Sequence, residues 1–267
     1  MSFLPAVLDD RLQRLFLGEL LATARGRATL LQQLGEAEGG DGGELDVFNH
    51  LLDVIDDVEV KKLVRVHKED EERHEQLFFA RRDAMGALAV PVPKSAHLLR
   101  RLDAHTGFFS RPITDRSGVV EAYMLLLVIE ERATRQFARW ETAFRAQGDD
   151  VTADVIQAIG QDEQRHLKYC EAITKRYSDD EATRQQRLAH YRAIELTCFD
   201  EVQAINLVFL VERGFVGHTW WTRALWIMLA ALAKRRMPAI AADRFPLAPV
   251  VFAERSAADG VEQLNGA

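Results

Sequence analysis

Apolar residues recur at the three-to-four-residue spacing of a helix along almost the whole chain, and no stretch alternates as a half-buried strand does. The pattern predicts a first helix over 9–34 that ends in the glycine-rich loop 35–43. Residues 44–55 are predicted as a short helix in the connection. Asp57 is placed to cap a long second helix that continues to residue 85. The chain is therefore expected to be all-α.

The second half repeats this organisation after a break. Prolines interrupt 90–93, and a crossover with a short helix near 95–104 follows. A third helix is expected over 118–147 and a fourth over 151–177, joined by a Gly-Asp-Asp turn. Two antiparallel helix pairs joined by a long crossover make a four-helix bundle.

Two more helices are predicted beyond the bundle, over 181–213 and 218–236, before a polar tail. We therefore divide the chain into a bundle domain, 1–180, and a C-terminal helical extension with its tail, 181–267.

The segment 215–236 is long enough to cross a bilayer and ends in basic residues. It also contains His218 and Arg223, and its densest apolar run is short. Packing on the bundle or on a second subunit is the favoured interpretation. Membrane association and a homodimer both stay open.

One pentapeptide pattern, Asp-Glu-x-Arg-His, occurs twice, at 70–74 and at 162–166, each time inside a predicted long helix. The Glu and the His of each copy are three residues apart and share one helix face. Each copy can therefore present one oxygen and one nitrogen ligand together, which is a pattern typical of dinuclear metal sites in helix bundles. The four candidate ligands are Glu71, His74, Glu163 and His166.

Two further carboxylates are expected at the same level, one on each remaining helix. Glu130 lies on an apolar face with Leu126, whereas Glu131 lies nearer to solvent. Glu19 lies on an apolar stripe with Phe16, and its distance from the end of the first predicted helix matches that of Glu71 from the start of the second. A buried carboxylate is costly unless it is paired or binds a metal.

With these residues the chain resembles the ferritin-like di-iron carboxylate superfamily over 9–177, in the order Glu, Glu-x-x-His, Glu, Glu-x-x-His. The fuller pentapeptide resembles the oxygen-activating branch, which includes bacterial multicomponent monooxygenases and acyl-carrier-protein desaturases. The resemblance implies two bound iron ions, with two manganese or a mixed pair as alternatives. It also implies supporting roles for the aspartates, which orient the histidines, and for the arginines, which neutralise the aspartates: Asp70, Asp162, Arg73 and Arg165.

His67 lies one turn before Glu71 on the same face. It is assigned to the surroundings of the site, as an extra ligand, a proton relay or a hydrogen-bonded core histidine.

Charge, cysteine content and the N-terminal residues narrow the classes of partner and the compartment that are expected. The net charge of −7 argues against a nucleic-acid partner. The two cysteines are far apart, and the N-terminal residues do not resemble a secretion signal, so a cytoplasmic protein is expected.

The leading hypothesis is a di-iron oxidoreductase that activates O₂ or peroxide and acts on an organic substrate as an oxygenase or desaturase does. An external electron-donor protein would be required. One alternative is ferroxidase, iron-storage or peroxide-scavenging activity of the rubrerythrin or manganese-catalase kind. Another is a non-catalytic helical interaction protein or a membrane-attached protein.

Overall fold

The computed structural model describes residues 10–40, 47–110, 112–178 and 180–236. Helices account for most of these residues, and no strand occurs among them. The predicted all-α fold is thus confirmed for the described part of the chain.

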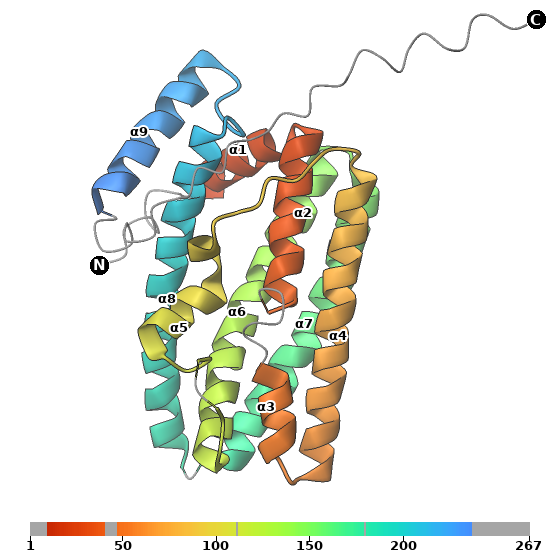
Figure 1. The fold of residues 1–267 in the computed structure, drawn as a ribbon, viewed down its shortest axis with the longest axis vertical. Helices are drawn as coiled ribbons and strands as arrows, with labels where there is room; N and C mark the ends of the chain where they lie inside the picture. The colour runs from red at the N-terminus through yellow and green to blue at the C-terminus, as the bar shows by residue number, and fades with distance from the viewer. Residues whose placement is uncertain (1–9, 41–46, 111, 179, 237–267) are drawn as a thin grey trace, which may run out of the picture.

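Four helices run side by side through the middle of the molecule (Figure 1): α2 (Ala24–Glu38), α4 (Val58–Ala84), α6 (Arg116–Ala146) and α7 (Asp150–Tyr177). Helix α8 (Glu181–Glu212), the longest helix described, runs along one side of them. Helix α2 packs against α4, and α6 packs against α7. The two pairs meet where α4 contacts α7. Helix α3 (Val47–Val54) packs beside the first half of α4, so α2 and α3 share the face of α4.

Aspartate caps define where the long helices begin. Asp57 accepts hydrogen bonds from the backbone N–H groups of Glu59 and Val60, which confirms the predicted start of α4. Asp149 accepts one from Thr152 at the start of α7. Gly148, with φ of +72°, makes the tight turn between α6 and α7, a backbone conformation that favours glycine.

The prediction of one continuous first helix over 9–34 is wrong, because the structure has two helices there. Helix α1 (Asp10–Leu21) ends, and Thr23 caps the start of α2 by accepting a hydrogen bond from the backbone N–H of Gly26. A Cβ atom at Gly26 would lie 1.8 Å from the carbonyl oxygen of Leu20. The chain therefore bends sharply where the sequence pattern reads as one helix.

The predicted glycine loop is also wrong at its beginning, because α2 continues to Glu38. A Cβ atom at Gly35 would lie 2.4 Å from the ring of Phe79, and one at Gly39 would lie 2.2 Å from Oε1 of Glu75. These glycines let α2 approach α4 closely. Of the short helix predicted at 44–55, residues 44–46 lie outside the described residues.

The crossover contains a 3₁₀ turn (Lys94–Ala96) and α5 (Leu98–Thr106), and both pack against α8. Helix α8 also packs along α6. Helix α9 (Trp220–Arg236) packs on α8 at the top of the view in Figure 1.

Two ion pairs join α8 to α6. Nη2 of Arg132 lies 2.5 Å from Oε2 of Glu195, and Nη2 of Arg192 lies 2.5 Å from Oε1 of Glu131. Among the described helices, none combines the length and the apolar composition that a membrane crossing requires.

The core forms two apolar layers along the bundle. One layer includes Phe78, Phe137 and Ile159, and the other includes Val64 and Leu127. On α4, α6 and α7 the chain passes from one layer to the other through a short polar stretch. These polar stretches meet between the two layers and form the candidate site.

Candidate metal centre

Two groups of side chains that could each hold a metal ion lie between the apolar layers, and Glu71 belongs to both. Within each group, the potential ligand atoms all lie within 4.8 Å of one another. The first group consists of His67, Glu71, Glu130 and His166; the second consists of Glu38, Glu71, His74 and Glu163.

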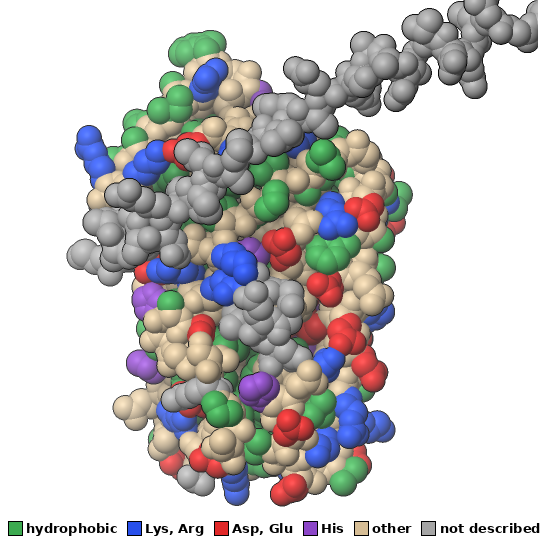
Figure 2. Space-filling model, viewed as in Figure 1, with side chains coloured by type: hydrophobic (Ala, Val, Ile, Leu, Met, Phe, Trp, Pro, Cys, Tyr) green, Lys and Arg blue, Asp and Glu red, His purple; other side chains and the backbone are tan. Residues whose placement is uncertain are grey.

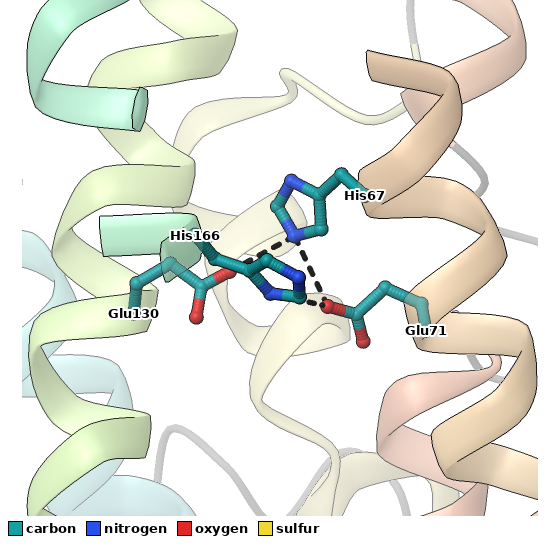
Figure 3. A group of neighbouring side chains, drawn as sticks. All are labelled: His67, Glu71, Glu130 and His166. Carbon is teal, nitrogen blue, oxygen red and sulfur yellow. Dashed lines mark hydrogen bonds and ion pairs between the residues drawn. The ribbon is translucent and has the colours of Figure 1, made fainter. Parts of the chain in front are cut away.

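In the first group, three helices direct their side chains toward a common point (Figure 3). Nε2 of His67 lies 3.0 Å from Oε1 of Glu71 and 3.2 Å from Oε1 of Glu130. Nδ1 of His166 lies 3.4 Å from the same oxygen of Glu71. The imidazoles of His67 and His166 and the carboxylate of Glu130 are buried.

In the second group, Nδ1 of His74 lies 3.3 Å from both Oε2 of Glu38 and Oε1 of Glu163. Oε2 of Glu163 lies 3.1 Å from Nδ1 of His166, which connects the two groups. Oε1 of Glu163 is buried and has no partner in hydrogen-bond geometry. A buried carboxylate oxygen without a hydrogen bond is costly, so a metal ion would fit this position well.

Each aspartate of the repeated motif contacts the histidine of the other copy. Oδ2 of Asp162 lies 3.2 Å from Nε2 of His74, and Oδ2 of Asp70 lies 3.2 Å from Nε2 of His166. An imidazole that donates through Nε2 keeps the lone pair of Nδ1 for a metal. In both histidines Nδ1 is the nitrogen that faces the glutamates.

The two arginines of the motif bridge the two aspartates. Nη2 of Arg73 lies 2.6 Å from Oδ1 of Asp70 and 2.7 Å from Oδ2 of Asp162. Arg165 also bonds both aspartates, donating from Nη1 to Asp162 and from Nη2 to Asp70. Burial alone would raise the pKa of Asp70, but its hydrogen bonds to Arg73, His166 and Arg165 lower it to about 2. The aspartates are therefore anionic acceptors for the histidines.

The charges of the cluster favour a bound cation. Burial raises the pKa of Glu130 well above its usual value, and the neighbouring Glu163 and Glu71 add to the effect. Burial and the negative charge of Glu71 likewise raise the pKa of Glu38 well above its usual value. Burial alone would lower the pKa of His74, but contacts with Glu163 and Glu38 raise it to about 11. Without metal, protons therefore supply the positive charge that this concentration of carboxylates needs.

Glu19 lies away from this cluster, and Glu38 occupies the place predicted for it. Oε2 of Glu19 accepts a hydrogen bond of 2.7 Å from the backbone N–H of Gly217 and one of 2.6 Å from the indole N–H of Trp226. The reason is the bend between α1 and α2, which turns Glu19 toward α9. A signal for Glu38 was present, because it continues the buried stripe of Leu31 and Leu34 once α2 is extended through Gly35.

The other predicted residues are brought together. Glu71, His74, Glu130, Glu163 and His166 all belong to the cluster. Glu131 points elsewhere, to Arg192, as the choice of Glu130 over its neighbour requires. His67 was assigned to the surroundings, but its Nε2 lies as close to the glutamates as the Nδ1 atoms of the other two histidines do.

A cavity of about 840 Å³ adjoins the cluster. Its walls include Glu71 and Glu130 together with many apolar side chains of α1, α2, α6 and α8, such as Leu17, Phe137 and Leu207. Asn206 of α8 also lines it, and its Oδ1 atom is buried without a hydrogen-bond partner. The candidate centre therefore opens onto a space that could admit a small molecule.

Comparison of the chain with protein-family models, with curated proteins and with solved structures gave no match. The geometry of the cluster is thus the basis for any assignment of function.

Proposed function

We propose that this chain is a ferritin-like dinuclear metalloprotein that binds two iron ions and uses O₂ or peroxide to oxidise an organic substrate. The supporting observation is the seven-residue donor set beside a largely apolar cavity of about 840 Å³. Cavities of roughly 300–1,000 Å³ are usual for small-molecule sites. The seven proposed ligands are Glu38, His67, Glu71, His74, Glu130, Glu163 and His166.

The chemistry of the donors supports iron or manganese. Carboxylate oxygen and imidazole nitrogen suit these metals, and no thiolate is among the donors. Two manganese ions or a mixed pair are therefore the alternative occupants. When bound, two Fe(II) ions would supply the electrons that reduce O₂ or peroxide, and an external donor protein would restore them.

The remaining residues of the site position the ligands. Asp70 and Asp162 hold the two motif imidazoles so that Nδ1 faces the centre, and Arg73 and Arg165 keep those aspartates ionised. The two apolar layers shield the polar cluster along the bundle, which strengthens each of these electrostatic contacts.

The walls of the cavity favour a neutral or cationic, mainly apolar substrate. Carboxylates from the cluster line it, and the guanidinium of Arg132 is already paired with Glu195. The unpaired Oδ1 of Asn206 would accept a hydrogen bond from an N–H or O–H group of the substrate.

Iron storage or peroxide removal is the second candidate function, because the same donors would serve it. Neither of these activities needs a large apolar cavity, whereas an oxygenase or desaturase needs one to hold its organic substrate. A non-catalytic helical protein is the third candidate, and it would have no need of seven converging donors.

The test is the metal content of the full chain produced with iron and manganese both available, compared with a His74→Ala/His166→Ala variant. We expect about two metal ions per chain in the parent and a clear loss in the variant. Predominance of manganese would support the peroxide-removing alternative. A metal content well below one per chain that the double substitution does not change would contradict the proposal.

A further inference from the structure

Helix α9 presents an outward face that is unusually apolar for a surface. Trp220 is 85% exposed, and Ile227 and Met228 are each more than half exposed. Trp221 and Leu232 extend the same face, with exposures of 47% and 42%. Elsewhere in the described residues, α4 carries three large exposed hydrophobic side chains, of which only Val58 is more than half exposed, and the others lie singly. A concentration of this kind marks an interaction surface.

The opposite face of α9 fixes its orientation. Trp226 and Ala233 are fully buried, and Leu229 is nearly so. The indole N–H of Trp226 donates to Glu19, and its ring packs edge-on against Phe16 of α1 at a centroid distance of 5.3 Å. Because these contacts hold one side of α9 on the bundle, the outward residues cannot turn inward by rotation of the helix.

The charges on α9 are all of one sign. The helix contains no acidic residue, whereas the whole chain has a net charge of −7. Arg223, Lys234 and Arg235 are exposed, and Lys234 forms an ion pair with Glu212 of α8. Figure 2 shows hydrophobic and basic side chains at the upper left of the molecule, with an acidic side chain among them. The outward face is therefore apolar with a basic border.

This combination favours a lipid surface over a second copy of the chain. Tryptophan, isoleucine and methionine can enter the boundary between headgroups and acyl chains, and basic side chains at the border can contact anionic headgroups. A two-fold symmetric dimer through the same face would bring Arg223 and Arg235 of both copies into one interface. Like charges would then oppose association.

We propose that α9 binds in the plane of an anionic membrane surface, with Trp220, Ile227 and Met228 inserted and Arg223 and Arg235 contacting lipid phosphates. Binding of this kind needs no membrane-spanning segment. It is independent of the metal centre, because the outward face of α9 contributes none of the seven proposed ligands.

The test is flotation of the full chain with vesicles of phosphatidylcholine alone or of phosphatidylcholine mixed with phosphatidylglycerol. We expect binding to the mixed vesicles that is at least about tenfold stronger than to the neutral ones. A Trp220→Ser/Ile227→Ser variant should lose it, and an Arg223→Gln/Arg235→Gln variant should lose the preference for anionic lipid. The matched control is Val58→Ser/Leu88→Ser, which also removes two highly exposed apolar side chains.

Equal flotation of the parent and the Trp220→Ser/Ile227→Ser variant would overturn the proposal. Absence of flotation in the parent would overturn it as well. In that case, sedimentation velocity decides what the face does. A dimer that this variant dissociates would assign the face to a second copy, and a monomer would leave it without either role.

Discussion

Nε2 of His74 on α4 lies 3.2 Å from Oδ2 of Asp162 on α7, so one copy of the repeated motif positions the histidine of the other. The reciprocal contact joins Asp70 to His166. The two long helices are therefore coupled at the level of the proposed metal centre. Replacement of either aspartate should therefore change the orientation of the histidine ligand on the opposite helix.

Asp162→Asn should weaken metal binding while the fold is retained. The amide lacks the negative charge that fixes the imidazole of His74, and loss of such a partner costs roughly 10- to 100-fold in metal affinity. Competition with a chelator measures the change. Asp154→Asn, on the exposed side of the same helix, is the control. Equal affinities for the two variants would contradict the positioning role.

Glu38 and Glu19 should behave differently when each is replaced by alanine. Glu38→Ala should lower the metal content, because Glu38 lies in the cluster. Glu19→Ala should leave the metal content unchanged. It should lower the free energy of unfolding by about 2 kcal/mol, because two hydrogen bonds to a charged acceptor are lost. Metal analysis and urea unfolding of both variants separate these outcomes.

His67→Leu should remove one metal ion and spare the other. His67 belongs to the first ligand group, and the second group does not contain it. We expect about one metal ion per chain in place of about two. A metal content equal to that of the parent would show that His67 is not a metal ligand and only lies beside the site.

The cavity should accept a neutral aromatic amine such as N-phenyl-1-naphthylamine, whose fluorescence reports transfer to an apolar space. Leu207→Trp would fill part of the cavity and should weaken binding of this probe by at least about tenfold. Asn206→Leu should weaken it less and should not affect a probe that lacks the N–H group. Metal content, which both variants should retain, shows that the centre is intact. Parent-like binding in Leu207→Trp would show that the probe binds elsewhere.

Alkaline pH should destabilise the fold through Cys198. Burial raises the pKa of this thiol to about 12, compared with about 8.5 in an unfolded chain. Between these values the unfolded state loses the proton and the folded state keeps it, so stability falls as pH rises. Urea unfolding from pH 8 upward measures the slope. Cys198→Ala should make it shallower, and an unchanged slope would exclude this thiol as the cause.

Local signals in the sequence predicted much of the molecule. Helical periodicity and the Asp57 cap placed α4, α6, α7 and α8 close to their observed bounds. The spacing of the repeated motif brought out four residues of the cluster, and the phase of one helix face separated Glu130 from Glu131. These features depend on residues within a few helical turns of one another, so they can be predicted from one sequence without knowledge of the tertiary contacts.

Only the tertiary structure decided which carboxylate the first pair of helices contributes. Gly35 reads as a loop signal in the sequence, but in the folded chain it lets α2 approach Phe79 of α4 closely. Whether a glycine ends a helix or admits a neighbour depends on a segment far away in the chain, and local patterns carry no record of that segment. The same holds for Asp70 and Asp162, whose histidine partners lie on the opposite helix. The sequence by itself therefore determined the helices from α4 onward and the donor types, and packing between helices decided how the first segment bends and which side chains meet.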